Sequence, residues 1–218
     1  MTFEHRESPV SFTLFPMVHV GDEQFYEEAF RDAYAHDVVL VEGIQSSVGR
    51  NLTRSYRWLD FERLGLVKQP KPPLPLLDSV PARIVKADLT TQEFHREWRK
   101  VSLLLRAILF VAAPLFGLYM RFFGSRARIA NRQSLEDRQS SEEILNWSPR
   151  FEPVYHSLLH ARDKRLIECM AAEIENAKTA RVAIVYGARH MRAVMRELTK
   201  RGFRCSKSTR RTIIALEW

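Results

Sequence analysis

Four side chains that could act as acids, bases or metal ligands each follow a predicted β-strand. Carboxylates and imidazoles bind divalent metals and are also the usual general acids and bases of enzymes. In an open parallel sheet, ligands bind outside the carboxyl ends of the strands. The four positions together therefore predict a functional cluster at that edge. They are His19 after segment 10–15, Glu42 at the end of segment 37–43, Asp88 at the end of segment 83–88, and His190 after segment 181–187.

The stretch VYGARHM, residues 185–191, places Gly187 three residues before His190, where a strand turns into a helix. Glycine allows a tight turn and a close approach of ligand to backbone. The free N–H groups of the following helix point at the same crevice, and Arg189 adds positive charge. We therefore expect Gly187, Arg189 and Asp88 to bind a peptide or a small anionic or carbonyl-bearing substrate. The alternatives are a turn histidine and, for Asp88, a helix N-cap.

Two charges interrupt the apolar stripe of the helix predicted around 154–175. Arg162 and Asp163 lie on the face that should be buried. An unpaired buried charge is costly, so each should pair with the other, with another site group or with a ligand. The alternative is a structural ion pair that anchors the helix on the sheet.

The elements that must position these residues alternate between strand and helix. This order predicts an α/β fold, a single domain over 1–218 with a central, mostly parallel sheet flanked by helices. One or two closing strands are expected from segments 203–205 and 210–218. The helices are predicted over 22–35, 49–66, 154–175 and 189–201, the last with Gly202 as its C-cap.

The middle of the chain is unusual. Segment 69–81 contains five prolines and is predicted to be an extended connection. Segment 90–150 is predicted to be a helical insertion, apolar first and then rich in arginine. Its first part, 90–123, reads as one long helix kinked by Pro114.

Residues 107–120 carry no charge and lie between Arg106 and Arg121. A spanning helix needs about 20 apolar residues, which favours a buried or membrane-surface helix over a true span. The next segment, 121–132, holds four arginines and no acid. Beside an apolar helix this composition suits an anionic membrane surface. The alternative is a solvated basic loop.

The composition is that of a globular domain of 218 residues, with 45% apolar and 28% charged residues. A net charge of +8 attracts anions, but no recognition motif supports nucleic acid. Two cysteines without paired spacing indicate a reducing compartment such as the cytoplasm. Acidic residues near the start argue against a secretory signal. The oligomeric state is left open, with a homo-oligomer among the options.

The order of four stretches resembles the TraB/PrgY/GumN family, relatives of the Tiki metalloproteases and of the EreA/ChaN-like fold. That resemblance implies a sheet flanked by helices in which two G-x-x-H motifs and a glutamate help form a metal or catalytic centre. Carried onto this chain, these are His19, Glu42, Gly187 and His190, with Arg162 and Asp163 from the intervening helix. The chain departs from the family at Pro16, where the first motif has glycine. The four stretches are LFPMVHVGDEQFYEE, DVVLVEG, HARDKRLIECMAAEI and VAIVYGARHMRAVMRELTKRGFRC.

The resemblance and the polar strand ends together favour a metal-dependent hydrolase of peptide, amide or ester bonds. His19, Glu42 and His190 would hold manganese, cobalt or zinc, which would activate a bound water. Glu42 or Asp163 would accept the proton, and Arg162 would stabilise negative charge. The alternative, favoured by Pro16, is a non-catalytic, membrane-associated binding or regulatory protein that retains the fold.

Overall fold

A computed structural model of the chain describes residues 1–44, 46–71, 82–132, 149–176 and 180–216. The predicted α/β fold with a mostly parallel central sheet is confirmed. Four neighbouring strands, β6, β4, β7 and β2, run parallel, and β1 lies antiparallel between β2 and β8. In sheet order the strands are β6 (Arg83–Lys86), β4 (Val38–Val41), β7 (Ala180–Gly187), β2 (Val10–Met17), β1 (Thr2–Glu4) and β8 (Arg204–Lys207).

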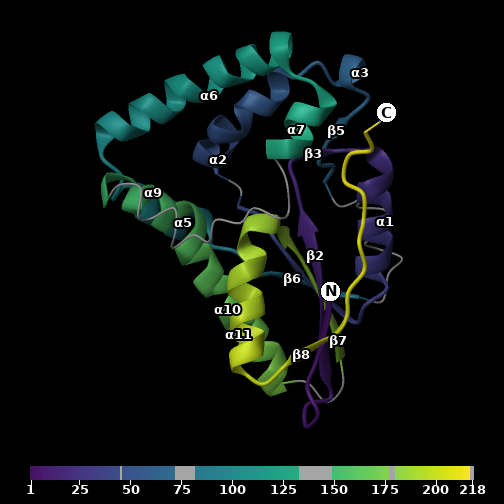
Figure 1. Cartoon of the computed structure of the whole chain (residues 1–218). Helices are drawn as coiled ribbons and strands as arrows, with labels where there is room; N and C mark the ends of the chain where they lie inside the picture. The colour runs from purple at the N-terminus through teal and green to yellow at the C-terminus, as the bar shows by residue number, and fades with distance from the viewer. Residues whose placement is uncertain (45, 72–81, 133–148, 177–179, 217–218) are drawn as a thin grey trace.

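Helices cover both faces of this sheet (Figure 1). Helix α1 (Glu23–Tyr34) covers one face, and α10 (Ala161–Asn176) and α11 (Met191–Lys200) cover the other. Successive side chains of a strand point to opposite faces, so the central strands must be apolar throughout. The β-branched runs of β4 and β7 satisfy this requirement and are buried almost completely.

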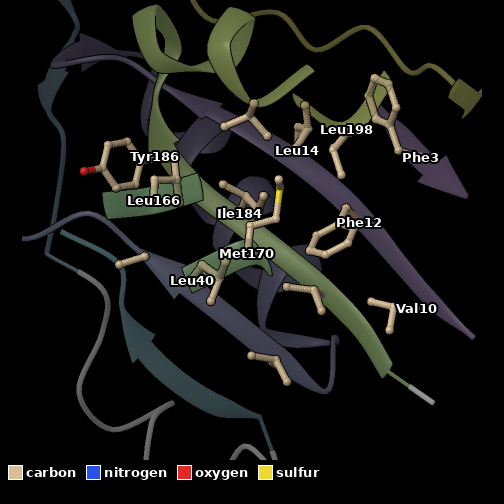
Figure 2. Close-up of a cluster of buried hydrophobic side chains, with 14 of the residues drawn as sticks. Phe3, Val10, Phe12, Leu14, Leu40, Leu166, Met170, Ile184, Tyr186 and Leu198 are labelled. Atoms are coloured by element: carbon tan, nitrogen blue, oxygen red, sulfur yellow. The ribbon is translucent and has the colours of Figure 1, made fainter. Parts of the chain in front are cut away.

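The larger apolar cluster lies between the sheet and the helices α10 and α11. Leu166 and Met170 of α10 pack there against Ile184 and Tyr186 of β7, and Leu198 of α11 joins them. Figure 2 shows Tyr186 at one end of this cluster, beyond Ile184. Fully burying one such side chain contributes roughly 1.5–3 kcal/mol. The cluster therefore fixes α10 on the sheet, with Tyr186 next to the carboxyl end of β7.

The helix predicted over 154–175 contains one wide turn. Helix α9 (Glu152–Tyr155) passes into the π-helical turn η3 (His156–His160), which leads directly into α10. A π-turn holds one more residue than an α-turn, and such turns are frequent at functional sites. This one ends two residues before Arg162.

The helical prediction for 49–66 holds, but the segment is divided into short helices. They lie beyond the carboxyl ends of the strands, together with a small two-stranded sheet, β3–β5. The remaining short elements are β3 (Val20–Gly21), α2 (Ser47–Leu52), η1 (Thr53–Trp58), α3 (Phe61–Leu64), β5 (Val67–Lys68), η2 (Pro149–Phe151) and η4 (Ala188–His190).

The prediction of one continuous helix over 90–123 is wrong. The chain forms α5 (Thr91–Trp98) and α6 (Leu103–Phe123), with a break between them, followed by α7 (Arg126–Arg132). Local caps explain the break, because Ser102 accepts a hydrogen bond from the N–H of Leu105 and starts a new helix. Pro114 lies inside α6.

One closing strand forms, within the one or two that the sequence predicts. Segment 204–207 forms β8, but the described residues beyond it, 208–216, form no strand. They are held instead by Asp22, whose carboxylate accepts from the N–H of Ala215 and from Arg126. Strand β1, which the sequence analysis did not predict, separates β8 from β2. Most of the proline-rich connection (72–81) and the later part of the insertion (133–148) lie outside the described residues. Gly202 follows Arg201, the C-cap of α11, and has the positive φ of +88° that suits a glycine at a helix end.

Helix α6 packs tightly on η1 at Gly117. A Cβ atom there would lie 2.7 Å from the carbonyl oxygen of Ser55. Backbone atoms cannot move away as a flexible side chain can, so only glycine fits this crossing.

We therefore predict that Gly117→Val lowers the free energy of unfolding by about 1–3 kcal/mol, because the added side chain forces α6 away from η1. The control is Ala112→Val at an exposed position of the same helix, which changes only helix propensity, by less than about 0.7 kcal/mol. Urea denaturation of both variants measures the difference. Equal losses would show that the Gly117 crossing is not tight.

Candidate functional site

Arg162 joins the carboxyl ends of two parallel strands. Its guanidinium donates to both oxygens of Asp88, from Nε at 3.0 Å and from Nη2 at 2.8 Å, and also to Glu42. Glu42 follows β4 and Asp88 follows β6, whereas Arg162 comes from the first turn of α10. The planar fork of arginine matches this two-point contact in a way that lysine cannot. The pair anticipated for Arg162 is therefore with these carboxylates rather than with Asp163.

Glu42 is held in its ionised form. Its second oxygen accepts the N–H of Gly187 at 2.7 Å. Burial opposes ionisation, but Arg162, His190 and this N–H outweigh it and lower the pKa of Glu42 to about 2. A Cβ at position 187 would lie 3.1 Å from the same oxygen, so the glycine lets the backbone come close. Such a carboxylate is a poor proton acceptor at neutral pH, which argues against the proton-accepting role anticipated for Glu42.

Asp88 is a buried anchor rather than a helix cap. Its carboxylate accepts the N–H of Gly43 at 3.1 Å and that of Leu89 at 2.8 Å, in addition to Arg162. The N-cap of α5 is Thr90, whose hydroxyl accepts from the N–H of Glu93. The N-cap alternative for Asp88 is therefore wrong. Asp88 ties the turn after β4 to the end of β6.

Asp163 and His190 form a second buried pair. The Asp163 carboxylate lies 2.6 Å from Nδ1 of His190, and both residues are less than 10% exposed. Tyr186 lies between this pair and Arg162. The His190 ring meets Tyr186 edge-on at 4.8 Å, and the Arg162 guanidinium lies 5.5 Å from the centroid of the same ring. Burial raises the pKa of Tyr186 well above its ordinary range. The Tyr186 ring thus lies between the Arg162 guanidinium and the His190–Asp163 pair, and we call this arrangement the stack.

A cavity of about 1300 Å³ opens beside this stack. His19 is an exposed residue on its wall, with its ring 5.0 Å from that of Tyr56 in η1. Desolvation within the cavity lowers the pKa of His19, Glu42 opposes the shift, and nearby cations including Arg189 reinforce it. The imidazole is therefore mainly neutral at pH 7. The site residues that line the cavity are His19, Glu42, Tyr56, Arg162, Gly187, Arg189 and His190.

The predicted metal ligands do not fit a metal ion in this arrangement. Within the part of the chain that is described, no three His, Cys, Asp or Glu side chains gather to hold one. Both oxygens of Glu42 accept from protein donors, and one nitrogen of His190 is taken by Asp163. The Arg162 guanidinium already supplies positive charge where Glu42 and Asp88 converge. The donor set proposed for manganese, cobalt or zinc is therefore not assembled.

The sequence analysis assigned most of these residues to the site, but not the two aromatic ones, Tyr186 and Tyr56. Arg162 and Asp163 do face inward, and the four polar strand ends meet at one edge. Tyr186 could have been found, because it is the last buried position of β7 before Gly187. The contact of Tyr56 with His19 has no local signal, because the orientation of the short helix η1 depends on tertiary packing.

Comparison of the chain with protein-family models, with curated proteins and with solved structures finds no match. The resemblance to the TraB/PrgY/GumN family therefore stays a prediction that rests on the four stretches quoted above.

Glu42 should make stability depend on pH. A carboxylate whose pKa falls from 4.5 to about 2 on folding stabilises the native state above pH 4.5 and loses that contribution as pH falls towards 2. By linkage this contribution is at most about 3 kcal/mol. We predict that the difference in unfolding free energy between wild type and Glu42→Gln shrinks from pH 7 to pH 3. Urea denaturation at each pH measures it. A difference that stays constant with pH would contradict the assignment.

Proposed function

We propose that the protein is a hydrolase that cleaves an ester or amide bond of a ligand bound in the cavity at the carboxyl ends of the strands. The observation that carries the proposal is the position of His19. A histidine with a lowered pKa lies on the wall of a cavity, next to a charged network that buried contacts hold in place. Neutral imidazole with access to solvent is the usual general base of hydrolytic enzymes.

In the proposed reaction, His19 takes a proton from a water molecule, and the water oxygen attacks the carbonyl carbon of the ligand. Glu42 does not take that proton, because its low pKa makes it a weak base. Its negative charge instead favours the imidazolium that forms on His19, an interaction that raises the pKa of His19. Arg162 holds Glu42 in place through its hydrogen bond to the carboxylate.

His190 is proposed as the general acid. Asp163 fixes the ring through its contact with Nδ1, leaving the other nitrogen to donate to the departing oxygen or nitrogen of the ligand. The bond to the leaving group breaks as that proton arrives, and its electron pair leaves with the departing atom. His19 then releases its proton to solvent, and His190 takes one back from solvent. Arg189 lies on the same wall, where its charge suits an anionic group of the substrate.

Two competing hypotheses differ in their observable consequences. A metal-dependent hydrolase of the Tiki type would lose activity on chelation and regain it with manganese, cobalt or zinc. A non-catalytic binding protein would hold ligands in the cavity without turnover. The pairing of Arg162 with both Glu42 and Asp88 favours this second alternative, because it leaves the guanidinium little charge to stabilise an anion that forms during hydrolysis.

We predict that His19→Gln lowers kcat/KM by about 10²–10⁴ on a panel of activated esters and peptide amides, the usual contribution of a general base. His156→Gln is the matched control, because that histidine pairs with Glu97 outside the cavity. Wild-type activity should rise with pH through an inflection below 6.5, since the base acts only when deprotonated. Unchanged activity in His19→Gln would overturn the role of His19. Ligand binding without turnover would favour the non-catalytic alternative.

A further inference from the structure

Helix α6 presents a long apolar face to solvent. It is long and apolar enough to cross a membrane. Only 11% of the 18-residue stretch that meets this criterion is buried inside the protein. Its outer face includes Leu104, Ile108, Val111, Leu115, Phe122 and Phe123, each more than half exposed. Soluble monomers rarely expose contiguous apolar patches of more than a few hundred Å², and larger ones mark protein or membrane interaction sites. We call this surface the outer face of α6.

The opposite side of α6 is fixed to the rest of the protein. Leu105 and Leu109 pack near Trp98 and Val101, and Gly117 contacts the backbone of Ser55. The helix therefore lies lengthwise along α2 and η1 (Figure 1). If it crossed a bilayer in this arrangement, the polar segment 47–58 would enter the hydrocarbon, where unsatisfied backbone groups are costly. A helix buried on one side and apolar on the other fits instead in the plane of a membrane surface.

The charge around the outer face of α6 favours an anionic membrane over a second copy of the chain as its binding partner. Segment 103–132 contains five arginines and no acidic residue. Arg121 is exposed beside Phe122, and Arg128 donates to the carbonyl of Phe123, so cationic side chains border the carboxyl end of the outer face. Such a border attracts anionic headgroups. A second copy of this chain, with its own net charge of +8, would bring like charge to the same place.

We propose that the outer face of α6 seats the protein in the plane of a bilayer that contains anionic lipid, with Arg121 and Arg128 at the headgroups and α2 and η1 on the aqueous side. The proposal does not depend on hydrolysis, because it rests on α6 and its flanking charges alone.

Binding of the full chain to vesicles tests the apolar contact. We expect co-sedimentation with phosphatidylcholine vesicles that contain phosphatidylglycerol, and a much weaker signal with phosphatidylcholine alone. The double variant Ile108→Gln, Leu115→Gln should lower the affinity at least about tenfold, because two apolar side chains no longer enter the membrane. Arg121→Gln should lower it about fivefold on anionic vesicles only. Ile84→Gln, at an exposed position of β6, is the control and should bind as wild type does.

Depth distinguishes the surface position from a span. Val111 lies on the outer face near the middle of α6, so a spanning helix would place it at the centre of the bilayer. The added fluorescence of Val111→Trp, relative to wild type, should be quenched by lipids brominated near the headgroup more than by those brominated at the chain ends. The reverse order would overturn the in-plane arrangement.

Two further results would overturn the proposal. One is unchanged vesicle binding by the Ile108→Gln, Leu115→Gln variant, since the contact would then lie elsewhere. The other is a dimer in sedimentation velocity without lipid that the same variant dissociates, which would assign the face to a second copy of the chain. Circular dichroism of each variant confirms that it is folded, so that a loss of binding is not a loss of structure.

Discussion

The structure depends on the ion pairs of Arg162 with Glu42 and Asp88. Removing charges from water is costly, and the cost is offset only when every donor and acceptor finds a well-placed partner. Here Arg162 forks onto Asp88, Glu42 takes the N–H of Gly187, and Asp88 takes that of Gly43. One guanidinium thereby fixes the ends of β4 and β6, the turn after β7 and the first turn of α10. A shift of any of these elements would leave a charge without its partner.

The apolar core and this network position each other. Leu166 and Met170 follow Arg162 at intervals of four residues, so all three lie on one face of α10. The two apolar side chains pack on the sheet, and the arginine reaches the carboxyl edge above Tyr186. Hydrophobic packing sets the rotation of the helix, and the carboxylates stop its sliding along the sheet. The same geometry places Asp163 one residue further round, against His190 instead of the carboxylates.

The sequence alone predicted those features of the fold and of the candidate site that local residue patterns determine. The buried β-branched runs and the polar residues after them are local signals, and so is the interruption of an apolar stripe at Arg162 and Asp163. The choice of partner is not local. Nothing near Arg162 in the sequence shows that Glu42 and Asp88, rather than Asp163, will accept its hydrogen bonds. This choice occupies one oxygen of Glu42, which the sequence analysis had placed among the metal ligands. The break before α6 was missed because the cap at Ser102 competes with a strong helical pattern, and β1 was missed because three residues are too few to show a period.

The π-helical turn at His156–His160 has a consequence for how such a site is inherited. It contributes one extra residue just ahead of Arg162, and each residue turns an α-helix by about 100°. Removing any one residue from this turn would keep every acid, base and arginine of the site in the sequence. It would nevertheless rotate α9 relative to Arg162 and Asp163. Either α9 or α10 would then lose its packing contacts with the rest of the protein. The length of this short segment is therefore under the same constraint as the identities of the charged residues, and two related chains could share all of those residues and still differ in whether the site assembles.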